Sequence, residues 1–233
     1  IFNLTIEAIF DRWGHLVIEL QVDAILCKID DFCLAVEEKG APLPMCWGFL
    51  DGTVRKISRP SRQQRLYYNG WKRVHALKYR AVDSTDGIIR QLWGPMLGRR
   101  HDVALLGESQ LLQSMMDSFH DAAGEPYYIY GDPAYQISPW LMAPYKRVLT
   151  PEQQDFNSGM SRVRVWPGGC PVSIRRLREK AAMVNEGPLV HRGDRYAVAG
   201  MLTNCHCCFY PNSTAQFFDV TPPDVQTYLE GQA

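Results

Sequence analysis

The chain has 233 residues, of which 46% are hydrophobic and 21% charged, with a formal net charge of zero. This length allows one large domain or two small ones, and the composition excludes a disordered chain. Seven cysteines at irregular spacing exclude a secreted disulfide framework and favour a reducing compartment. No apolar run approaches the roughly 20 residues of a membrane span, and no secretory signal is predicted.

The zero net charge hides four blocks of different sign. Residues 1–45 carry three basic and eight acidic residues, whereas residues 55–100 carry twelve basic and two acidic residues. Residues 101–145 carry six acidic residues and no Lys or Arg, and residues 146–200 carry ten basic and five acidic residues. Such blocks suit a positive surface beside an acidic site, for an anionic polymer and a cation. The alternative is a solvated face on which the signs mix after folding.

Hydrophobic periodicity and turn residues predict the secondary structure. In chain order the elements are helices over 4–13 and 22–36, a hairpin of 45–50 with 54–57, a second hairpin of 74–82 with 87–93, a helix over 102–116, a strand over 127–130, and helices over 139–142 and 151–160. Asp-Gly turn residues mark both hairpins. Thr150 caps the last helix and Pro151 takes its first position. This order predicts an α/β layer domain.

Two aspartates adjoin a glycine after a short apolar run. Asp51 lies in Gly-Phe-Leu-Asp-Gly-Thr and Asp132 in Tyr-Ile-Tyr-Gly-Asp. In this way a fold presents a carboxylate at the end of a buried strand, and two such carboxylates suit a hard divalent cation with oxygen ligands. In the alternative reading, Asp51 forms a turn and Asp132 ends a strand.

Five motifs in a fixed order carry a resemblance to a known family. They are GFLDGT at 48–53, QRLYYNG at 64–70, HALK at 75–78, GRRHD at 98–102 and GDPAY at 131–135. With these motifs the chain resembles the DDE superfamily endonucleases of PIF/Harbinger-type transposases, from about residue 43 to 165 and again over 196–228. The resemblance implies an RNase H-like mixed sheet flanked by helices. It divides the chain into a helical lead-in, 1–44, and a nuclease domain, 45–229.

The resemblance also implies cut-and-paste DNA transposition by two Asp and one Glu that bind a pair of Mg²⁺ (or Mn²⁺) ions. Asp51 is then the first catalytic, metal-binding acid and Asp132 the second. Asp102, in the GRRHD motif, is read as a helix cap or as a group behind the metal ligands. Two cations about 4 Å apart activate a water and stabilise the leaving oxygen. A nuclear location follows from the family alone.

The third acid is missing where the family carries Val-Glu-Trp. Here Val165 runs directly into Trp166, and no acid follows before Glu179. Two Gly and two Pro within residues 167–171 exclude a regular helix there, so 166–195 is an aberrant segment. A shifted reading frame, a wrong splice site and the decay of an old element each account for this break.

Three glutamates are candidates to replace the missing acid, and none is predicted to do so. Glu179 lies on a predicted helix over 173–183, among arginines and away from the apolar side. Glu152 lies in the first turn of another helix, where a carboxylate suits the helix N-terminus. Glu186 precedes a Gly-Pro loop. The sequence therefore predicts an incomplete acid set.

Basic residues near aromatic ones are candidates for the DNA backbone, because Arg and Lys bind phosphates and aromatic rings stack on unpaired bases. These candidates are Arg65, Lys72, Arg73, Arg99 and Arg100. The alternative is exposed arginines beside core aromatics. Cys205-His206-Cys207-Cys208 resembles a metal cluster, but zinc ligands are usually separated by at least two residues. Inert buried thiols are predicted there instead.

Two functions of different class follow. The first is a transposase-derived, divalent-metal-dependent DNA endonuclease that is incomplete through loss of the Glu. The second is a non-catalytic DNA- or partner-binding module that keeps the fold, and a third reading is a chain whose segment 166–195 never packs. The helices predicted within 1–45 are acidic and do not suit DNA reading, so a separate DNA-binding partner would choose the target.

Overall fold

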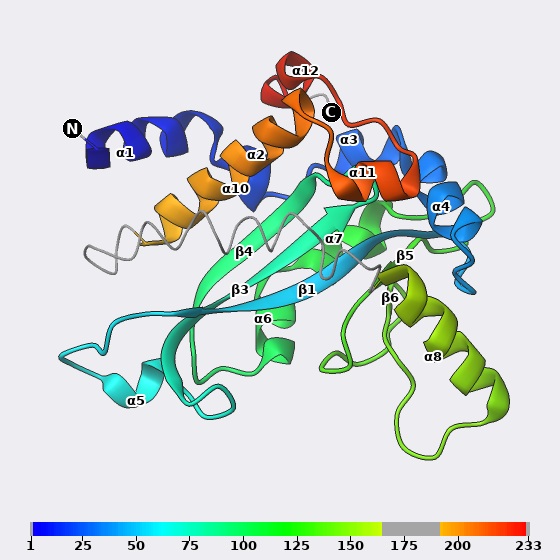
Figure 1. Ribbon diagram of the computed structural model, residues 1–233, viewed down its shortest axis with the longest axis horizontal. Helices are drawn as coiled ribbons and strands as arrows, with labels where there is room; N and C mark the ends of the chain where they lie inside the picture. Colours follow the sequence, from blue (N-terminus) through cyan, green and yellow to red (C-terminus); the bar gives the residue numbers. More distant parts are fainter. Residues whose placement is uncertain (1, 165–191, 232–233) are drawn as a thin grey trace.

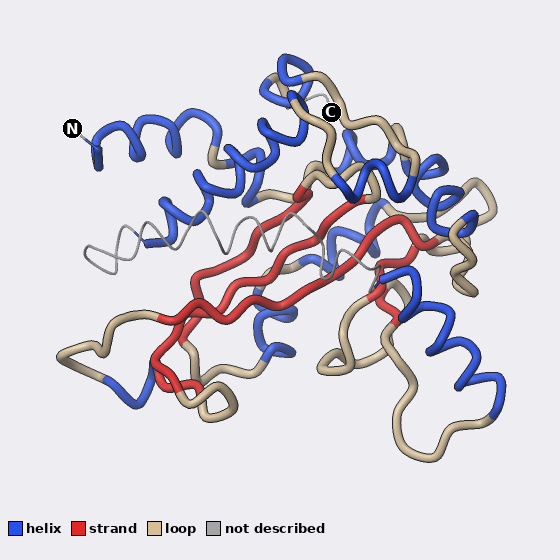
Figure 2. Tube along the Cα trace, viewed as in Figure 1, coloured by secondary structure: helices blue, strands red, loops and turns tan. Residues whose placement is uncertain are grey.

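The computed structural model describes residues 2–164 and 192–231. In this part, six strands form one mixed sheet flanked by helices (Figures 1 and 2). The strands are β1 (Cys46–Lys56), β2 (Tyr68–Asn69), β3 (Val74–Ser84), β4 (Ile89–Leu97), β5 (Tyr128–Tyr130) and β6 (Leu141–Met142). Their order is β2-β3-β1-β5-β6, with β4 also paired to β3. The predicted α/β class is confirmed, and the arrangement is consistent with an RNase H-like domain.

Helices cover both faces of this sheet. They are α1 (Phe2–Trp13), α2 (His15–Ile18), α3 (Val22–Leu26), α4 (Ile29–Glu38), α5 (Gln64–Tyr67), α6 (Asp102–Glu108), α7 (Leu111–Ser118), α8 (Pro151–Arg164), α10 (Arg192–Phe209), α11 (Ser213–Phe218) and α12 (Val225–Leu229). Tyr79 and Ala81 of β3 pack with α2, α10 and α12, whereas Val82 packs with α6 and α7. This alternation follows from the two-residue period of a strand. Among the described helices, none combines the length and apolar character that a bilayer crossing requires.

The first predicted hairpin is wrong, because residues 46–56 form the single strand β1. Its antiparallel ladder with β3 runs from Gly48 opposite Ser84 to Lys56 opposite Ala76 without interruption. Asp51 and Gly52 lie within this ladder. Pairing with a long neighbour overrides the local turn preference of Asp-Gly, since strand preference depends strongly on context. Asp51 therefore lies in the middle of β1 and not at a strand end.

Three further predicted elements differ from the structure. The helix expected over 22–36 is interrupted between α3 and α4, and the one expected over 102–116 is divided into α6 and α7. The second break coincides with Gln110, whose backbone is left-handed at φ 53°. Residues 139–142 contain β6 in place of a helix, because this segment pairs in parallel with β5. The predicted helix at 4–13, the second hairpin, the strand at 127–130 and the helix at 151–160 are confirmed.

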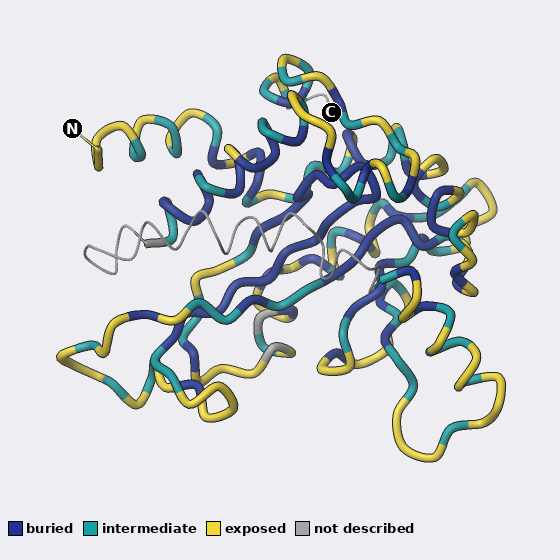
Figure 3. The backbone as a smooth tube through the Cα atoms, in the orientation of Figure 1, coloured by how far each residue is buried: buried dark blue, intermediate teal, exposed yellow. Residues whose placement is uncertain are grey.

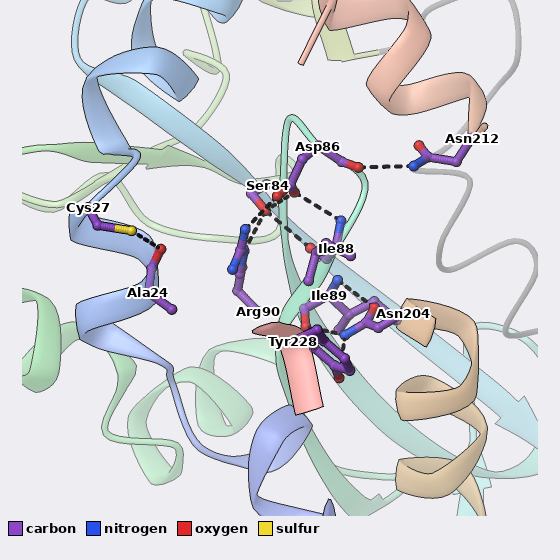
Figure 4. A network of polar contacts seen from close by, with 10 residues as sticks. All are labelled: Ala24, Cys27, Ser84, Asp86, Ile88, Ile89, Arg90, Asn204, Asn212 and Tyr228. Carbon is purple, nitrogen blue, oxygen red and sulfur yellow. Dashed lines mark hydrogen bonds and ion pairs between the residues drawn. The ribbon is translucent and has the colours of Figure 1, made fainter. Parts of the chain in front are cut away.

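A buried polar network holds the turn of the β3–β4 hairpin (Figure 4). The Asp86 carboxylate pairs with Arg90 at 2.5 Å, and both side chains are buried. Ser84 joins this pair, donating to Asp86 at 2.5 Å and accepting from Arg90 Nε at 2.7 Å. Because charges are stable in a core only when they are paired and hydrogen-bonded, these groups depend on one another.

Two asparagines connect this hairpin to the C-terminal helices (Figure 4). Asn204 of α10 accepts from Ile89 N–H and donates to Ile89 C=O, both at 2.9 Å, and also donates to the Tyr228 hydroxyl. Asn212 donates to the Asp86 carbonyl at 3.0 Å. The hairpin turn is thereby fastened to α10, α12 and the residue that precedes α11.

Candidate active site

Asp51 lies within β1, and Asp132 follows the neighbouring parallel strand β5. β1 and β5 pair in parallel with Phe49 opposite Tyr130, and the aspartates come two residues later on each segment. Neighbouring strands lie about 4.8 Å apart, so the pairing of Phe49 with Tyr130 brings together the segments that lead to the two aspartates. Both are partly buried.

The Asp132 carboxylate also organises its own turn. The Asp132 Oδ1 atom accepts a hydrogen bond from the Ala134 N–H at 2.7 Å. The backbone carbonyl of Asp132 accepts one from the Tyr135 N–H at 3.2 Å. Tyr135 is buried against the sheet, which fixes the turn. This turn role of Asp132 and a ligand role are compatible, because a carboxylate has two oxygens.

The helix α8 covers the face of the sheet on which Phe49 lies. Its N-terminus is a capping box, in which Gln153 N–H donates to Thr150 Oγ1 at 3.3 Å and Gln153 Oε1 accepts from Thr150 N–H at 3.2 Å. Met160 and Val163 of α8 pack in one cluster with Phe49 and Tyr130, the residues two positions before the aspartates. This packing fixes where the last described turn of α8 lies.

Arg164, the last residue of α8, contacts the first aspartate. Its Nη2 lies 3.4 Å from Asp51 Oδ1 and 3.4 Å from the Leu50 carbonyl oxygen. The two side chains are only 15% and 13% exposed. This contact is not among those predicted from the sequence, although Arg164 follows the buried Met160 by four residues and so lies on the same helix face.

The structure separates Glu152, one of the three candidate replacement acids, from this position. Glu152 lies in the first turn of α8, and twelve residues of helix, about 18 Å, separate it from Arg164. A backbone N–H and the Thr150 hydroxyl lower the pKa of the Glu152 carboxyl, as expected for a helix N-terminus. The segment that follows Arg164, with Glu179 and Glu186, lies outside the described residues.

Among the described residues, the carboxylates of Asp51 and Asp132 are of the kind that binds a divalent cation. Mg²⁺ is usually bound by one or two carboxylates, with water and substrate phosphates completing the shell. Asp51 in β1 and Asp132, two residues after β5, are the candidates for such carboxylates. Within residues 2–164 and 192–231, no group of three or more His, Cys, Asp or Glu side chains forms a metal cluster.

The five basic candidates lie on exposed segments beyond the far end of β3 and β4 (Figures 1 and 3). We call Arg65, Lys72, Arg73, Arg99 and Arg100 the basic tip. Its segments are joined by hydrogen bonds, from Arg99 N–H to Leu66 C=O at 3.2 Å and from Asn69 Nδ2 to Gly98 C=O at 3.0 Å. Arg100 also forms an exposed ion pair with Glu108.

Gly98 permits this close packing within the basic tip. A Cβ atom at this position would lie 2.5 Å from the Tyr67 carbonyl oxygen and 2.6 Å from that of Ala76. Ala76 pairs with Lys56, five residues along β1 from Asp51, which is about 17 Å of strand. The contact of Gly98 with Ala76 therefore lies at a position about 17 Å along β1 from Asp51. Asp102 is the first residue of α6, as expected of a helix-capping position, and its side chain is not among those that the structure describes.

The Cys-His-Cys-Cys motif lies within α10 and is part of the core. Cys207 is buried, and Cys205 and Cys208 pack against the same cluster. Burial raises the pKa of Cys208 to about 12, so its thiol stays protonated and unreactive. Of the thiols predicted to be buried here, Cys207 is buried, whereas Cys205 and Cys208 are partly buried.

Comparison with known proteins gives one family. A family model described as DDE superfamily endonuclease matches residues 50–179, more than half of the chain. The match contains Asp51 and Asp132 and continues past Val165, where the sequence analysis places the break, but does not reach 196–228. No curated protein and no solved structure matches the chain. The chain therefore belongs to the DDE superfamily of endonucleases.

Proposed function

We propose that the chain is a Harbinger-type, transposase-derived DNA endonuclease domain that depends on a divalent metal and lacks the third acid of its family. The observation that supports this proposal is the parallel pairing of β1 with β5, the strands that lead to Asp51 and Asp132, together with the contact of the last described residue of α8 with Asp51. The proposed nuclease domain is 45–229, preceded by the lead-in 1–44. The proposed reaction is hydrolysis or transfer of a DNA phosphodiester.

The candidate residues would bind the metal and the DNA backbone in this reaction. When bound, Mg²⁺ or Mn²⁺, expected as two ions, would activate a water and stabilise charge on the leaving oxygen. Asp51 and Asp132 would hold the metal, and the turn closed by Ala134 N–H orients the Asp132 carboxylate. Cations of the basic tip would bind backbone phosphates of the DNA.

Plasmid nicking tests the enzymatic proposal. Nicking in Mg²⁺ or Mn²⁺ is expected to disappear in Asp51→Asn and in Asp132→Asn, because each change removes a negative ligand. The amide introduced by Asp132→Asn keeps an oxygen for the Ala134 N–H, so the turn survives. Asp155→Asn, an equal charge change at an exposed position of α8, serves as the control. Equal nicking by all four proteins would reject the enzyme.

DNA binding by the basic tip is expected to weaken steeply with salt. If four or five cations each neutralise one phosphate, the logarithm of the binding constant should fall with a slope of about −4 against log salt. Lys72→Gln should reduce that slope by about 0.9, and Arg100→Gln by less, since Glu108 already pairs with Arg100. Fluorescence anisotropy with a labelled duplex from 50 to 200 mM salt measures this. A flat salt response would contradict the proposed surface.

A second candidate is a non-catalytic DNA- or partner-binding module. The Arg164–Asp51 ion pair favours it, because a guanidinium already neutralises the first acid. This module predicts salt-dependent DNA binding together with equal background nicking in the chain and its Asp51→Asn variant. In both cases we propose a nuclear location and a separate DNA-binding partner that chooses the target.

A further inference from the structure

The loop between β2 and β3 displays a tryptophan. Tyr68 pairs with His75 and Asn69 with Val74, which leaves residues 70–73 as the loop of a short hairpin. Trp71 in this loop is 89% exposed, the largest exposed fraction of any aromatic residue in the described part of the chain. Burying such a ring would typically gain at least about 1.5–3 kcal/mol, so folding does not explain its position.

The loop is held in shape from two sides. Lys72 N–H donates to Asn69 Oδ1 at 2.8 Å, and Asn69 Nδ2 donates to the Gly98 carbonyl at 3.0 Å. Asn69 itself is buried, and Arg73 adopts a left-handed backbone at φ 53°. These contacts anchor the loop to the segment after β4. A ring on an anchored loop loses less conformational entropy on binding than one on a free tail.

The surroundings of Trp71 carry only positive formal charge in the sequence. Lys72 and Arg73 follow it directly, and no acidic residue occurs from Gly52 to Val82. Arg65 and Arg99 lie on the segments joined to this hairpin. A ligand that suits this site combines a flat ring with flanking negative charges. An unpaired nucleotide has that combination, whereas the bases of an intact duplex already stack on one another.

We propose that Trp71 stacks on an unpaired base of single-stranded or frayed DNA, with Lys72 and Arg73 on the flanking phosphates. The proposal rests on the DNA binding proposed above and adds the class of ligand. Lys72 and Arg73 then hold the strand through charge, and Trp71 distinguishes an unpaired strand from a duplex.

Binding of a 12-nucleotide oligothymidine and of a duplex of equal length, by fluorescence anisotropy at fixed salt, tests this site. Trp71→Ala should weaken single-strand binding about tenfold and duplex binding less than twofold, whereas Trp71→Phe should retain most single-strand affinity. Lys72→Gln should weaken both ligands equally. Phe209→Ala, at an exposed aromatic residue of α10, is the control. An unchanged melting temperature shows that each variant is folded.

The outcomes separate this inference from the proposed function. If Trp71→Ala leaves single-strand binding unchanged, or weakens both ligands equally, the stacking site is rejected. If Lys72→Gln still weakens DNA binding in that case, the DNA-binding proposal survives. If neither substitution affects either ligand, the DNA-binding surface itself is rejected.

Discussion

Asp86→Ala is expected to lower the free energy of unfolding by about 3–5 kcal/mol, the usual cost of removing one partner of a buried ion pair. Asp86 is fully buried, and its carboxylate accepts from Arg90, Ser84 and the Ile88 N–H. Without it, the Arg90 guanidinium remains in the core with no compensating charge from this residue. The same turn is fastened to Asn212, so the loss should spread to the C-terminal helices.

Urea unfolding followed by circular dichroism measures this loss, with Asp155→Ala as the matched control. Asp155 is exposed on α8, so its replacement should change the unfolding free energy by less than about 0.5 kcal/mol. The double variant Asp86→Ala/Arg90→Met should recover part of the loss, because the uncompensated charge is removed as well. A loss below about 1 kcal/mol in Asp86→Ala would show that the pair is not important for stability.

Elements with strong local signals were predicted correctly from the sequence. The helix α8 begins where Thr150 and Pro151 predict it, because capping is decided by neighbouring residues. The second hairpin turns at Gly87, which adopts φ 81° as its turn requires. By contrast, β1 crosses Asp51-Gly52 without turning, since its pairing with β3 is a long-range interaction. No local pattern reports such pairing.

The candidate site, too, was predicted from the sequence only in part. Asp51 and Asp132 are recognisable in the sequence because each follows an apolar run and adjoins Gly. The pairing of the strands that lead to them is not recognisable, because it depends on the β1–β5 register and on an irregularity between Cys46 and Gly48. The buried hydrogen bonds from Asn204 to Ile89 and from Asn212 to Asp86 also join residues too far apart in sequence to be paired from one chain alone.

Arg164→Gln is expected to tighten Mn²⁺ binding about 10- to 100-fold. The guanidinium lies 3.4 Å from Asp51 Oδ1, and both groups are mostly buried, so it competes with a metal for the same carboxylate. Coulomb's law gives about 5 kcal/mol at this separation and an effective dielectric constant near 20. Desolvation and side-chain entropy offset much of that energy, which leaves about 1.4–2.8 kcal/mol for the competition.

Titration calorimetry with Mn²⁺ on the whole chain measures this competition without relying on catalysis. Arg162→Gln is the matched control, because it removes the same charge from an exposed position two residues earlier on α8. Equal Mn²⁺ affinities in the two variants would mean that Arg164 affects metal binding only through the overall charge of the protein. Weaker binding in Arg164→Gln would mean that Arg164 positions Asp51 for the metal. If Asp51→Asn binds Mn²⁺ as tightly as the unaltered chain, the metal site fails. Tighter binding in Arg164→Gln alone would therefore identify Arg164 as the cation that a metal must displace from Asp51.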